Sequence, residues 1–182
     1  MIIVIAGPPC SGKSAVGELL AERCGIPHLE MDAVRIRILP DAAHTREDRA
    51  VAYRAMHLTA ELLAASGAAV IVNACYGHEE DRSDLESAAE RAQALLYLIE
   101  CTVPPDTAVE RSRQRWGKHP GVDLTPERVT ELVTSYTFSG AGVTVDSTLP
   151  LETALARIED YLALGSPLGT ATPKRTWSRS AS

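Results

Sequence analysis

The sequence predicts an α/β fold, with helices covering both faces of a mostly parallel sheet. Short, continuous runs of aliphatic residues alternate along the chain with longer amphipathic segments, and glycines and prolines separate the two kinds of segment. Uninterrupted apolar runs are typical of strands buried on both faces, and strands that alternate with helices form parallel sheets. The 182 residues correspond to one domain, since domains average about 150 residues. We therefore expect a single three-layer domain.

Five segments are expected to form the sheet. The clearest are the β-branched or aliphatic runs that end at turn-forming or polar residues. The predicted strands are Ile2–Ala6, the short segment Pro27–Met31, Val70–Val72, Leu95–Val103 and Val143–Val145.

Six helices are expected between and after these strands. Thr45 and Thr125 are good N-cap residues, Pro126 suits a first helical position, and Thr107 with Glu110 has the spacing of a capping box. The predicted helices are Ser14–Cys24, Thr45–Ala65, Ser83–Ala94, Thr107–Arg115, one that begins after Thr125, and Leu151–Leu164.

Composition and charge exclude several classes of protein. With 45% hydrophobic residues the chain can bury a core, and it does not have the composition of a disordered protein. Residues 165–182 contain three basic residues and no acid, so the remaining 15 basic and 24 acidic residues give a net charge of −9. Nucleic-acid and anionic-membrane proteins usually carry positive charge, and the 4% of aromatic residues leaves few stacking platforms for bases.

Cysteine usage and the lengths of the apolar runs point to a cytoplasmic protein. The four cysteines are scattered without a C-x-x-C pair, which fits free thiols in a reducing compartment, and no run is long enough to span a membrane. We expect residues 1–164 to form the domain. Residues 165–182 are expected to form a flexible basic tail, because they are rich in Ser, Thr, Pro and Gly.

The most specific motif is a phosphate-binding loop between the first strand and the first helix. Residues 7–14 read Gly-Pro-Pro-Cys-Ser-Gly-Lys-Ser and match G-x-x-x-x-G-K-[ST]. Such a loop aims backbone amides at phosphate oxygens, the lysine reaches the β- and γ-phosphates, and the following hydroxyl binds Mg²⁺. The residues expected to bind a nucleoside triphosphate here are Gly7, Pro9, Cys10, Ser11, Gly12, Lys13 and Ser14.

The chain resembles small P-loop kinases and phosphotransferases of the chloramphenicol phosphotransferase, gluconate kinase, shikimate kinase and polynucleotide kinase type. The resemblance spans about residues 1–164 and rests on the loop together with positional similarities at residues 27–32, 69–73, 100–115 and 145–147. It implies a P-loop NTPase-type fold with a small lid, ATP or GTP as phosphoryl donor, and Mg²⁺ as cofactor. We expect a monomer or a homodimer.

By this resemblance, Asp32 is the acid that faces the γ-phosphate and either accepts a proton from the acceptor hydroxyl or helps to hold Mg²⁺. A carboxylate suits both roles. Asp32 could instead be the N-cap of a helix over residues 33–38. Glu30 gives a Glu-x-Asp pattern that is similar to the D-x-D of shikimate kinases, but it could also face solvent.

The acceptor is expected between the second strand and the long helix, where basic residues and potential hydrogen-bonding groups are concentrated. Asn73 lies where many relatives carry a metal-binding aspartate, and its neutral amide makes direct metal binding doubtful. Charged residues on a long helix are also commonly just solvated. The candidate acceptor-binding residues are Asp32, Arg35, Tyr53, His57, Asn73 and Tyr76.

By the same resemblance, residues 111–125 form a mobile lid whose arginines stabilise the transferring phosphoryl group. Arg115 is the first candidate, and Arg111 lies one turn away on the same helix face. Arg113 fits a solvated surface better. Ser147, after the last strand, is expected to border the nucleotide base, although a plain turn would also explain it.

The predicted activity is ATP- or GTP-dependent transfer of the γ-phosphate to a hydroxyl of a small molecule, with Lys13, Asp32 and Arg115 as catalytic residues and Ser14 and Asp32 at the metal. The acceptor could be an antibiotic, in which case phosphorylation would confer resistance. It could instead be a metabolic sugar acid, nucleoside or nucleotide. A nucleotide-dependent switch is the alternative from another class. No nucleic-acid or membrane partner is expected.

Overall fold

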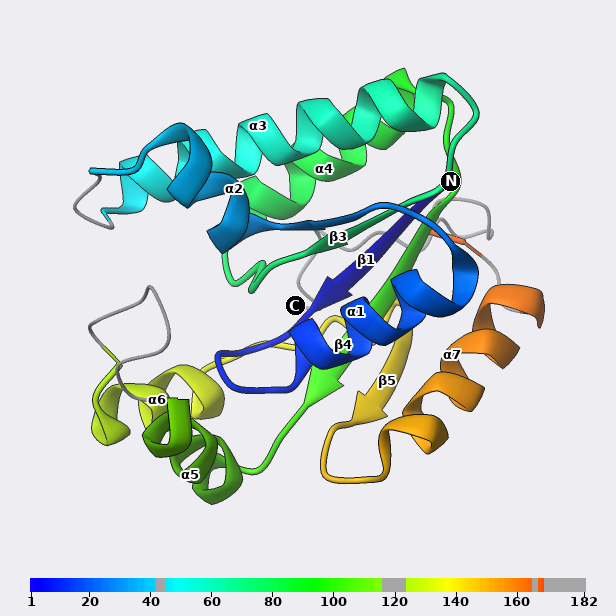
Figure 1. Ribbon diagram of the computed structural model, residues 1–182. Helices are drawn as coiled ribbons and strands as arrows, with labels where there is room; N and C mark the ends of the chain where they lie inside the picture. The colour runs from blue at the N-terminus through cyan, green and yellow to red at the C-terminus, as the bar shows by residue number, and fades with distance from the viewer. Residues whose placement is uncertain (42–44, 116–123, 165–166, 169–182) are drawn as a thin grey trace.

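The computed structural model describes residues 1–41, 45–115, 124–164 and 167–168. Five strands and seven helices alternate along this part of the chain (Figure 1). The strands are β1 (Ile2–Ala6), β2 (His28–Glu30), β3 (Val70–Asn73), β4 (Leu96–Thr102) and β5 (Val143–Asp146). The helices are α1 (Lys13–Cys24), α2 (Met31–Ile38), α3 (Arg46–Ala65), α4 (Glu79–Arg91), α5 (Pro105–Arg115), α6 (Pro126–Thr134) and α7 (Leu151–Leu164).

The strands form one sheet in the order β2-β3-β1-β4-β5, and every pair of neighbours is parallel. This confirms the predicted five-stranded α/β sheet. Because all strands run the same way, their carboxyl ends meet at one edge, which is where open parallel sheets bind ligands. The register places Glu30 of β2 opposite Asn73 of β3.

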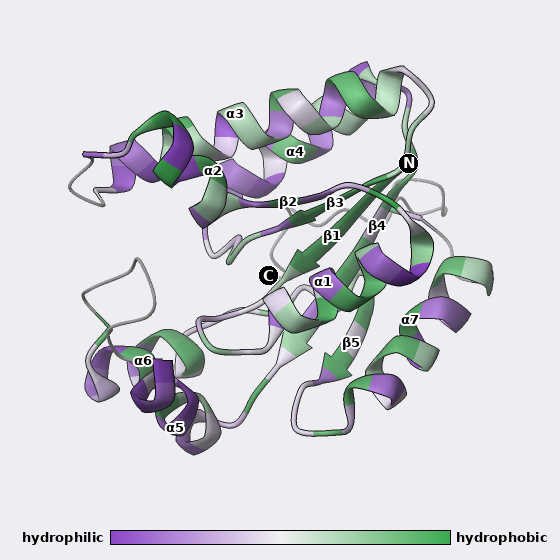
Figure 2. Cartoon of the chain, in the orientation of Figure 1, coloured by the Kyte–Doolittle hydropathy of each residue, from purple (hydrophilic) through white to green (hydrophobic). Residues whose placement is uncertain are grey.

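Two apolar clusters cover the two faces of the sheet. Strand residues such as Val4 and Val72 pack under α2, α3 and α4, whereas Ile5 and Ile71 pack against α1 and α7. Figures 1 and 2 show hydrophobic strands in the middle layer and helices with mixed hydropathy on either side. A third, smaller cluster joins α5 to α6 through Ala108 and Val129. The sheet is therefore buried on both faces, as its continuous apolar runs predict.

The helix starts test the cap predictions. Thr45 caps α3 in a capping box with Asp48, and Thr125 caps α6 with Pro126 in its first turn, as predicted. The starts of α4 and α5 were predicted too late. Helix α4 begins at Glu79 rather than Ser83, and α5 begins at Pro105 rather than Thr107. Prolines and acids are favourable in a first turn, so both helices extend toward their N-termini.

Two further observations concern Leu168, which follows α7, and the length of the helices. Leu168 is buried in the α2–α3–α4 cluster, and its N–H donates to the carbonyl of Leu96, so the chain still contacts the sheet beyond α7. Within the described ranges, no helix is both long enough and apolar enough to cross a lipid bilayer.

Candidate active site

The phosphate-loop motif forms a tight turn between β1 and α1. Gly12 is the N-cap of α1 with φ +80°, a left-handed conformation that glycine adopts without steric cost. A Cβ at this position would lie 3.0 Å from the Cβ of Ser147. The ammonium of Lys13 turns back across the loop and donates to the carbonyl of Pro8 at 2.8 Å. The loop therefore places Lys13 and the N-terminus of α1 directly after the carboxyl end of β1.

Glu30 at the end of β2 and Asn73 at the end of β3 lie beside the loop. The hydroxyl of Ser14 donates to Oε1 of Glu30, and Nδ2 of Asn73 donates to the same oxygen at 3.3 Å. Sequence reasoning left Glu30 open between a functional and a solvent-facing role. Here the carboxylate joins the first turn of α1 to the ends of β2 and β3.

These contacts fit a magnesium site of the kind that nucleotide phosphates complete. Mg²⁺ prefers oxygen ligands, retains several waters, and is usually held by one or two carboxylates or hydroxyls plus phosphate oxygens. Ser14 and Glu30 supply such oxygens. The amide nitrogen of Asn73 points at Glu30 and so orients the carboxylate. The described residues include no cluster of three or more His, Cys, Asp or Glu arranged to hold a metal alone.

Asp32 lies in the first turn of α2, immediately beyond β2. The N-cap of α2 is Glu30, so the interpretation of Asp32 as a helix cap is wrong. Its side chain is 40% exposed, and Oδ1 lies 3.6 Å from Nε of Arg35 one turn later. Asp32 is therefore accessible at the same sheet edge as the Glu30 site, two residues farther along the chain.

Arg111 and Ser147 form the other wall of the phosphate loop. The guanidinium donates to the carbonyl of Cys10 at 3.2 Å, to the Ser147 hydroxyl at 2.8 Å and to the Ser147 carbonyl at 2.6 Å. The arginine thus connects the loop to the turn between β5 and α7.

A cavity of about 310 Å³ opens between these elements. Its walls combine apolar side chains of α1, α7 and the turn before α7 with polar groups of α5 and Ser147. The lining residues are Gly12, Ala15, Val16, Arg111, Gln114, Arg115, Ser147, Leu149, Leu151 and Ala154. An apolar floor with a few polar groups is the usual composition of a small-molecule site, and this one borders the phosphate loop.

Arg115 is exposed at the end of α5 and shares this cavity with Arg111. Arg113 is exposed, as expected for a solvated residue. Most of the predicted lid, residues 116–123, lies outside the described residues. Burial is the main effect on the Cys10 thiol and raises its pKa, while Arg115 and Lys13 act in the opposite direction. The thiol is therefore protonated at neutral pH, which fits a packing role.

The predicted acceptor residues Tyr53, His57 and Tyr76 form one buried aromatic group under the β3–α4 loop. His57 stacks on Tyr76 with ring centroids 5.8 Å apart, and its Nε2 lies 3.1 Å from the Tyr76 hydroxyl. The Tyr53 hydroxyl accepts from the backbone N–H of Tyr76 at 3.0 Å. All three side chains are at most 4% exposed, so they support the loop from below.

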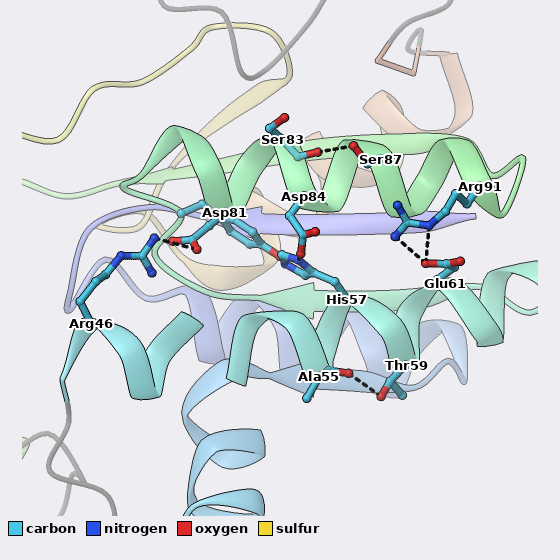
Figure 3. Close-up of polar contacts among 11 residues, drawn as sticks. Arg46, Ala55, His57, Thr59, Glu61, Asp81, Ser83, Asp84, Ser87 and Arg91 are labelled. Atoms are coloured by element: carbon cyan, nitrogen blue, oxygen red, sulfur yellow. Dashed lines mark hydrogen bonds and ion pairs between the residues drawn. The ribbon is translucent and has the colours of Figure 1, made fainter. Parts of the chain in front are cut away.

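Helices α3 and α4 hold this group through charged contacts (Figure 3). Nδ1 of His57 lies 2.6 Å from Asp84, and Arg46 pairs with Asp81 at 3.0 Å. Burial lowers the pKa of His57 below its usual value, although Asp84 opposes this shift. Burial also raises the pKa of Tyr76 well above its usual value.

Sequence reasoning missed several charged residues near the candidate site. Arg37, Arg49 and Arg54 belong to the basic region between the second strand and the long helix, and all three are exposed. Asp81, Arg82 and Asp84 were missed, and Asp81 and Arg82 are buried although they are charged. Their positions depend on how α3 packs against α4, so no local sequence pattern marks them.

Comparison with known proteins identifies the family. A family model described as an AAA domain matches residues 2–139. The chain belongs to this AAA domain family. No curated protein sequence matches it significantly.

Solved structures share the family fold over nearly the whole chain. A gluconokinase from Sinorhizobium meliloti is 27% identical with a TM-score of 0.65, covering 88% of this chain and 90% of the other. An APS kinase from Mycobacterium tuberculosis is 22% identical with a TM-score of 0.72, covering 89% and 96%. A shikimate kinase from Acinetobacter baumannii is 18% identical with a TM-score of 0.58, covering 90% and 92%. The resemblance to small P-loop kinases is thereby confirmed.

Proposed function

We propose that this protein is an ATP- or GTP-dependent O-phosphotransferase that transfers the γ-phosphate to a hydroxyl of a small molecule. One observation carries the proposal: the loop serine Ser14 is hydrogen-bonded to Glu30, and the exposed Asp32 follows two residues later. This brings a phosphate-binding loop, oxygen ligands for a cation and a partly exposed carboxylate to one edge of the sheet.

Each residue has a defined role in this proposal. Lys13 and the loop amides bind the β- and γ-phosphates, replacing the contact of Lys13 with the Pro8 carbonyl. Ser14 and Glu30 would hold Mg²⁺, which neutralises phosphate charge when bound. Asp32 accepts the hydroxyl proton of the acceptor, and Arg115 stabilises charge on the transferring group.

The cavity beside Arg111 is proposed to receive the base and ribose of the nucleotide. It borders the loop at Gly12 and opens between α1, α5 and α7. Arg111 is already fixed by Cys10 and Ser147, so it positions the wall of the cavity, while the exposed Arg115 remains available to the phosphates.

A metabolic acceptor is proposed ahead of an antibiotic. The similar structures named above are kinases of gluconate, APS and shikimate, and the gluconokinase is the most identical of the three at 27%. The nucleotide-dependent switch fits less well, because a switch has no use for an exposed carboxylate beside the phosphate loop.

The deciding experiment measures nucleoside diphosphate release from ATP and GTP with Mg²⁺ across sugar acids, nucleosides, nucleotides and hydroxylated antibiotics. Phosphorylated products are detected by mass spectrometry. We expect one compound class both to stimulate release and to gain a phosphoryl group. Slow release that no compound stimulates, without a phosphorylated product, would contradict the proposal and favour the switch.

A further inference from the structure

One peptide group at the start of the β3–α4 loop is held from three directions. It joins Cys75 to Tyr76, just beyond the end of β3. Its carbonyl oxygen accepts from the Tyr136 hydroxyl at 2.7 Å and from the N–H of Gly7 at 3.4 Å. Its N–H donates to the Tyr53 hydroxyl at 3.0 Å. This single peptide group therefore connects the phosphate loop, helix α3 and the segment that follows α6.

The backbone at this peptide group needs such support. Tyr76 has φ +52°, a left-handed conformation that is uncommon for a residue with a Cβ. A backbone of this kind persists only where several surrounding contacts fix it. Two of the three contacts are tyrosine hydroxyls, one from α3 and one from the segment after α6. Loss of either hydroxyl should loosen the loop while the tyrosine ring stays packed.

Tyr136 is itself anchored to the sheet. Its ring packs against Phe138 with ring centroids 4.8 Å apart. The carboxylate of Glu100 on β4 is fully buried and accepts hydrogen bonds from the backbone N–H groups of Ser139 and Gly140 at 2.9 and 3.0 Å. The segment between α6 and β5 is therefore fixed to β4 and, through Tyr136, to the β3–α4 loop.

The helices α5 and α6 carry the arginines of the candidate site and also contact the phosphate loop. Helix α5 ends at Arg115, and Figure 1 shows both helices beyond the carboxyl ends of the strands. Cys10 of the phosphate loop packs against the apolar cluster that joins them, and its carbonyl accepts from Arg111. Because Tyr136 follows α6, its hydroxyl ties this helix pair to the β3–α4 loop.

We propose that Tyr136 is a positioning residue for phosphoryl transfer. Its hydroxyl acts through the Cys75 carbonyl and fixes the β3–α4 loop relative to the phosphate loop and α5. This inference rests on the proposed function and adds a residue that acts through the backbone. A displacement of about 1 Å between reacting groups can lower a rate by about 100-fold, so such a contact affects the rate of transfer more than the affinity for ATP.

The test compares variants of the full chain that each lose one tyrosine hydroxyl. Tyr136→Phe and Tyr53→Phe each remove one contact of the clamped peptide group. Tyr161→Phe is the matched control, because its hydroxyl on α7 accepts from the backbone N–H of Leu98 in the first half of β4, away from this loop. Initial rates are measured with Mg²⁺, ATP and the acceptor that the compound panel identifies, at a temperature at which every variant is folded.

We expect Tyr136→Phe to lower kcat by roughly 10- to 100-fold and to change the KM for ATP by less than about twofold. Its melting temperature should fall by a few degrees at most, because the Cys75 carbonyl keeps its contact with Gly7 and the ring remains against Phe138. Tyr161→Phe should keep kcat within about twofold of wild type.

The double variants separate positioning from a general loss of stability. Tyr53→Phe and Tyr136→Phe act on one peptide group, so their combined loss of kcat should be smaller than the product of the two single losses. The effects of Tyr161→Phe and Tyr136→Phe should multiply, because the two hydroxyls contact different parts of the sheet.

Amide hydrogen exchange tests the link without any turnover. In Tyr136→Phe, the amides of Gly7 and Tyr76 should exchange roughly 2- to 10-fold faster than in wild type, as expected for the loss of one hydrogen bond. In Tyr161→Phe, both amides should exchange at the wild-type rate.

Unchanged exchange at Gly7 and Tyr76 in Tyr136→Phe would overturn the inference. A kcat within about twofold of wild type would do the same, as would equal losses of kcat in Tyr136→Phe and Tyr161→Phe. If no compound is phosphorylated, the proposed function fails, and the exchange result then decides alone: faster exchange at both amides supports the link from Tyr136 to the two loops, and unchanged exchange rejects it.

Discussion

At the scale of single residues, Glu30 is the centre of the candidate site. Its carboxylate accepts hydrogen bonds from Ser14 of the phosphate loop and from Asn73 of the adjacent strand. Among the described residues, Asp32 makes no such hydrogen bond with the loop, and it stays partly exposed. Two acids separated by one residue are therefore in different surroundings, which is the usual way in which neighbouring carboxylates acquire different roles.

Substitution of each acid should give a different kinetic result. Asp32→Asn is expected to lower kcat by about 10²- to 10⁴-fold, the usual contribution of a general base, with little change in the Mg²⁺ requirement. Glu30→Gln should instead raise the Mg²⁺ concentration needed for half-maximal rate, because it weakens the oxygen set around Ser14. Both effects are read from rates measured across a Mg²⁺ titration. Near-normal kcat in Asp32→Asn would remove this residue from the reaction.

At the scale of elements, the β3–α4 loop depends on α3 for its shape. Tyr76 has φ +52°, an uncommon conformation for a residue with a Cβ. The Tyr53 hydroxyl on α3 accepts a hydrogen bond from the backbone N–H of Tyr76. The hydroxyl of Tyr136 donates to the Cys75 carbonyl at 2.7 Å. His57 and Asp84 then join α3 to α4 beneath the loop. The packed pair of helices thus supports the loop at the edge of the sheet where the acceptor is proposed to bind.

This support should make stability depend on pH. Burial lowers the pKa of His57 in the folded protein, while the unfolded value is about 6.5. Below that pH the unfolded chain binds more protons, so the stability supplied by neutral His57 is complete above pH about 6.5 and is lost as pH falls through and below it.

His57→Phe keeps a ring against Tyr76 and removes the titration. We expect it to lose about 1–3 kcal/mol of stability at pH 7.5, from the lost hydrogen bonds, and to show a shallower loss between pH 7 and 5 than wild type. Denaturant unfolding at a series of pH values measures the loss of stability and its dependence on pH. His28, whose pKa is also lowered by burial, remains in both proteins, so the difference isolates His57. Equal slopes in the two proteins would contradict the assignment.

At the scale of the whole molecule, the proposed nucleotide site lies where separately packed clusters meet. Helices α1 and α7 belong to one core cluster, α2, α3 and α4 to a second, and α5 with α6 to a third. The cavity near Arg111 is lined from α1, α5 and α7, so a bound nucleotide would touch two of these clusters. Binding at such a boundary should stabilise the whole fold.

Nucleotide binding should therefore raise the melting temperature in a way that depends on Lys13. A ligand at 100 times its Kd adds about 2.7 kcal/mol, which corresponds to roughly 5–10 °C for a domain of this size. Lys13→Ala should fold normally, because the one hydrogen bond that its side chain makes among the described residues is to a loop carbonyl, but it should lose most of this shift. Thermal unfolding of wild type and Lys13→Ala with and without Mg²⁺ and ATP measures the shift in melting temperature. A full shift in Lys13→Ala would reject the assignment of the phosphate loop.

The sequence alone determined the parts of this protein that depend on local pattern. Continuous apolar runs predicted the parallel sheet, threonines predicted the starts of α3 and α6, and the glycine-lysine-serine motif predicted the phosphate loop. These features are encoded within a few neighbouring residues, so they can be read before the chain is folded.

Only the tertiary structure decided which polar residues meet. Glu30 meets Ser14 and Asn73 because β2 pairs with β3 in one register, and a shift of one residue would turn its side chain to the other face. Likewise, the packing of α2 and α3 buries Arg35 and leaves Arg37 exposed, although both belong to one short basic segment. Such differences arise from contacts between residues far apart in the sequence, and these contacts are set by strand order and helix packing.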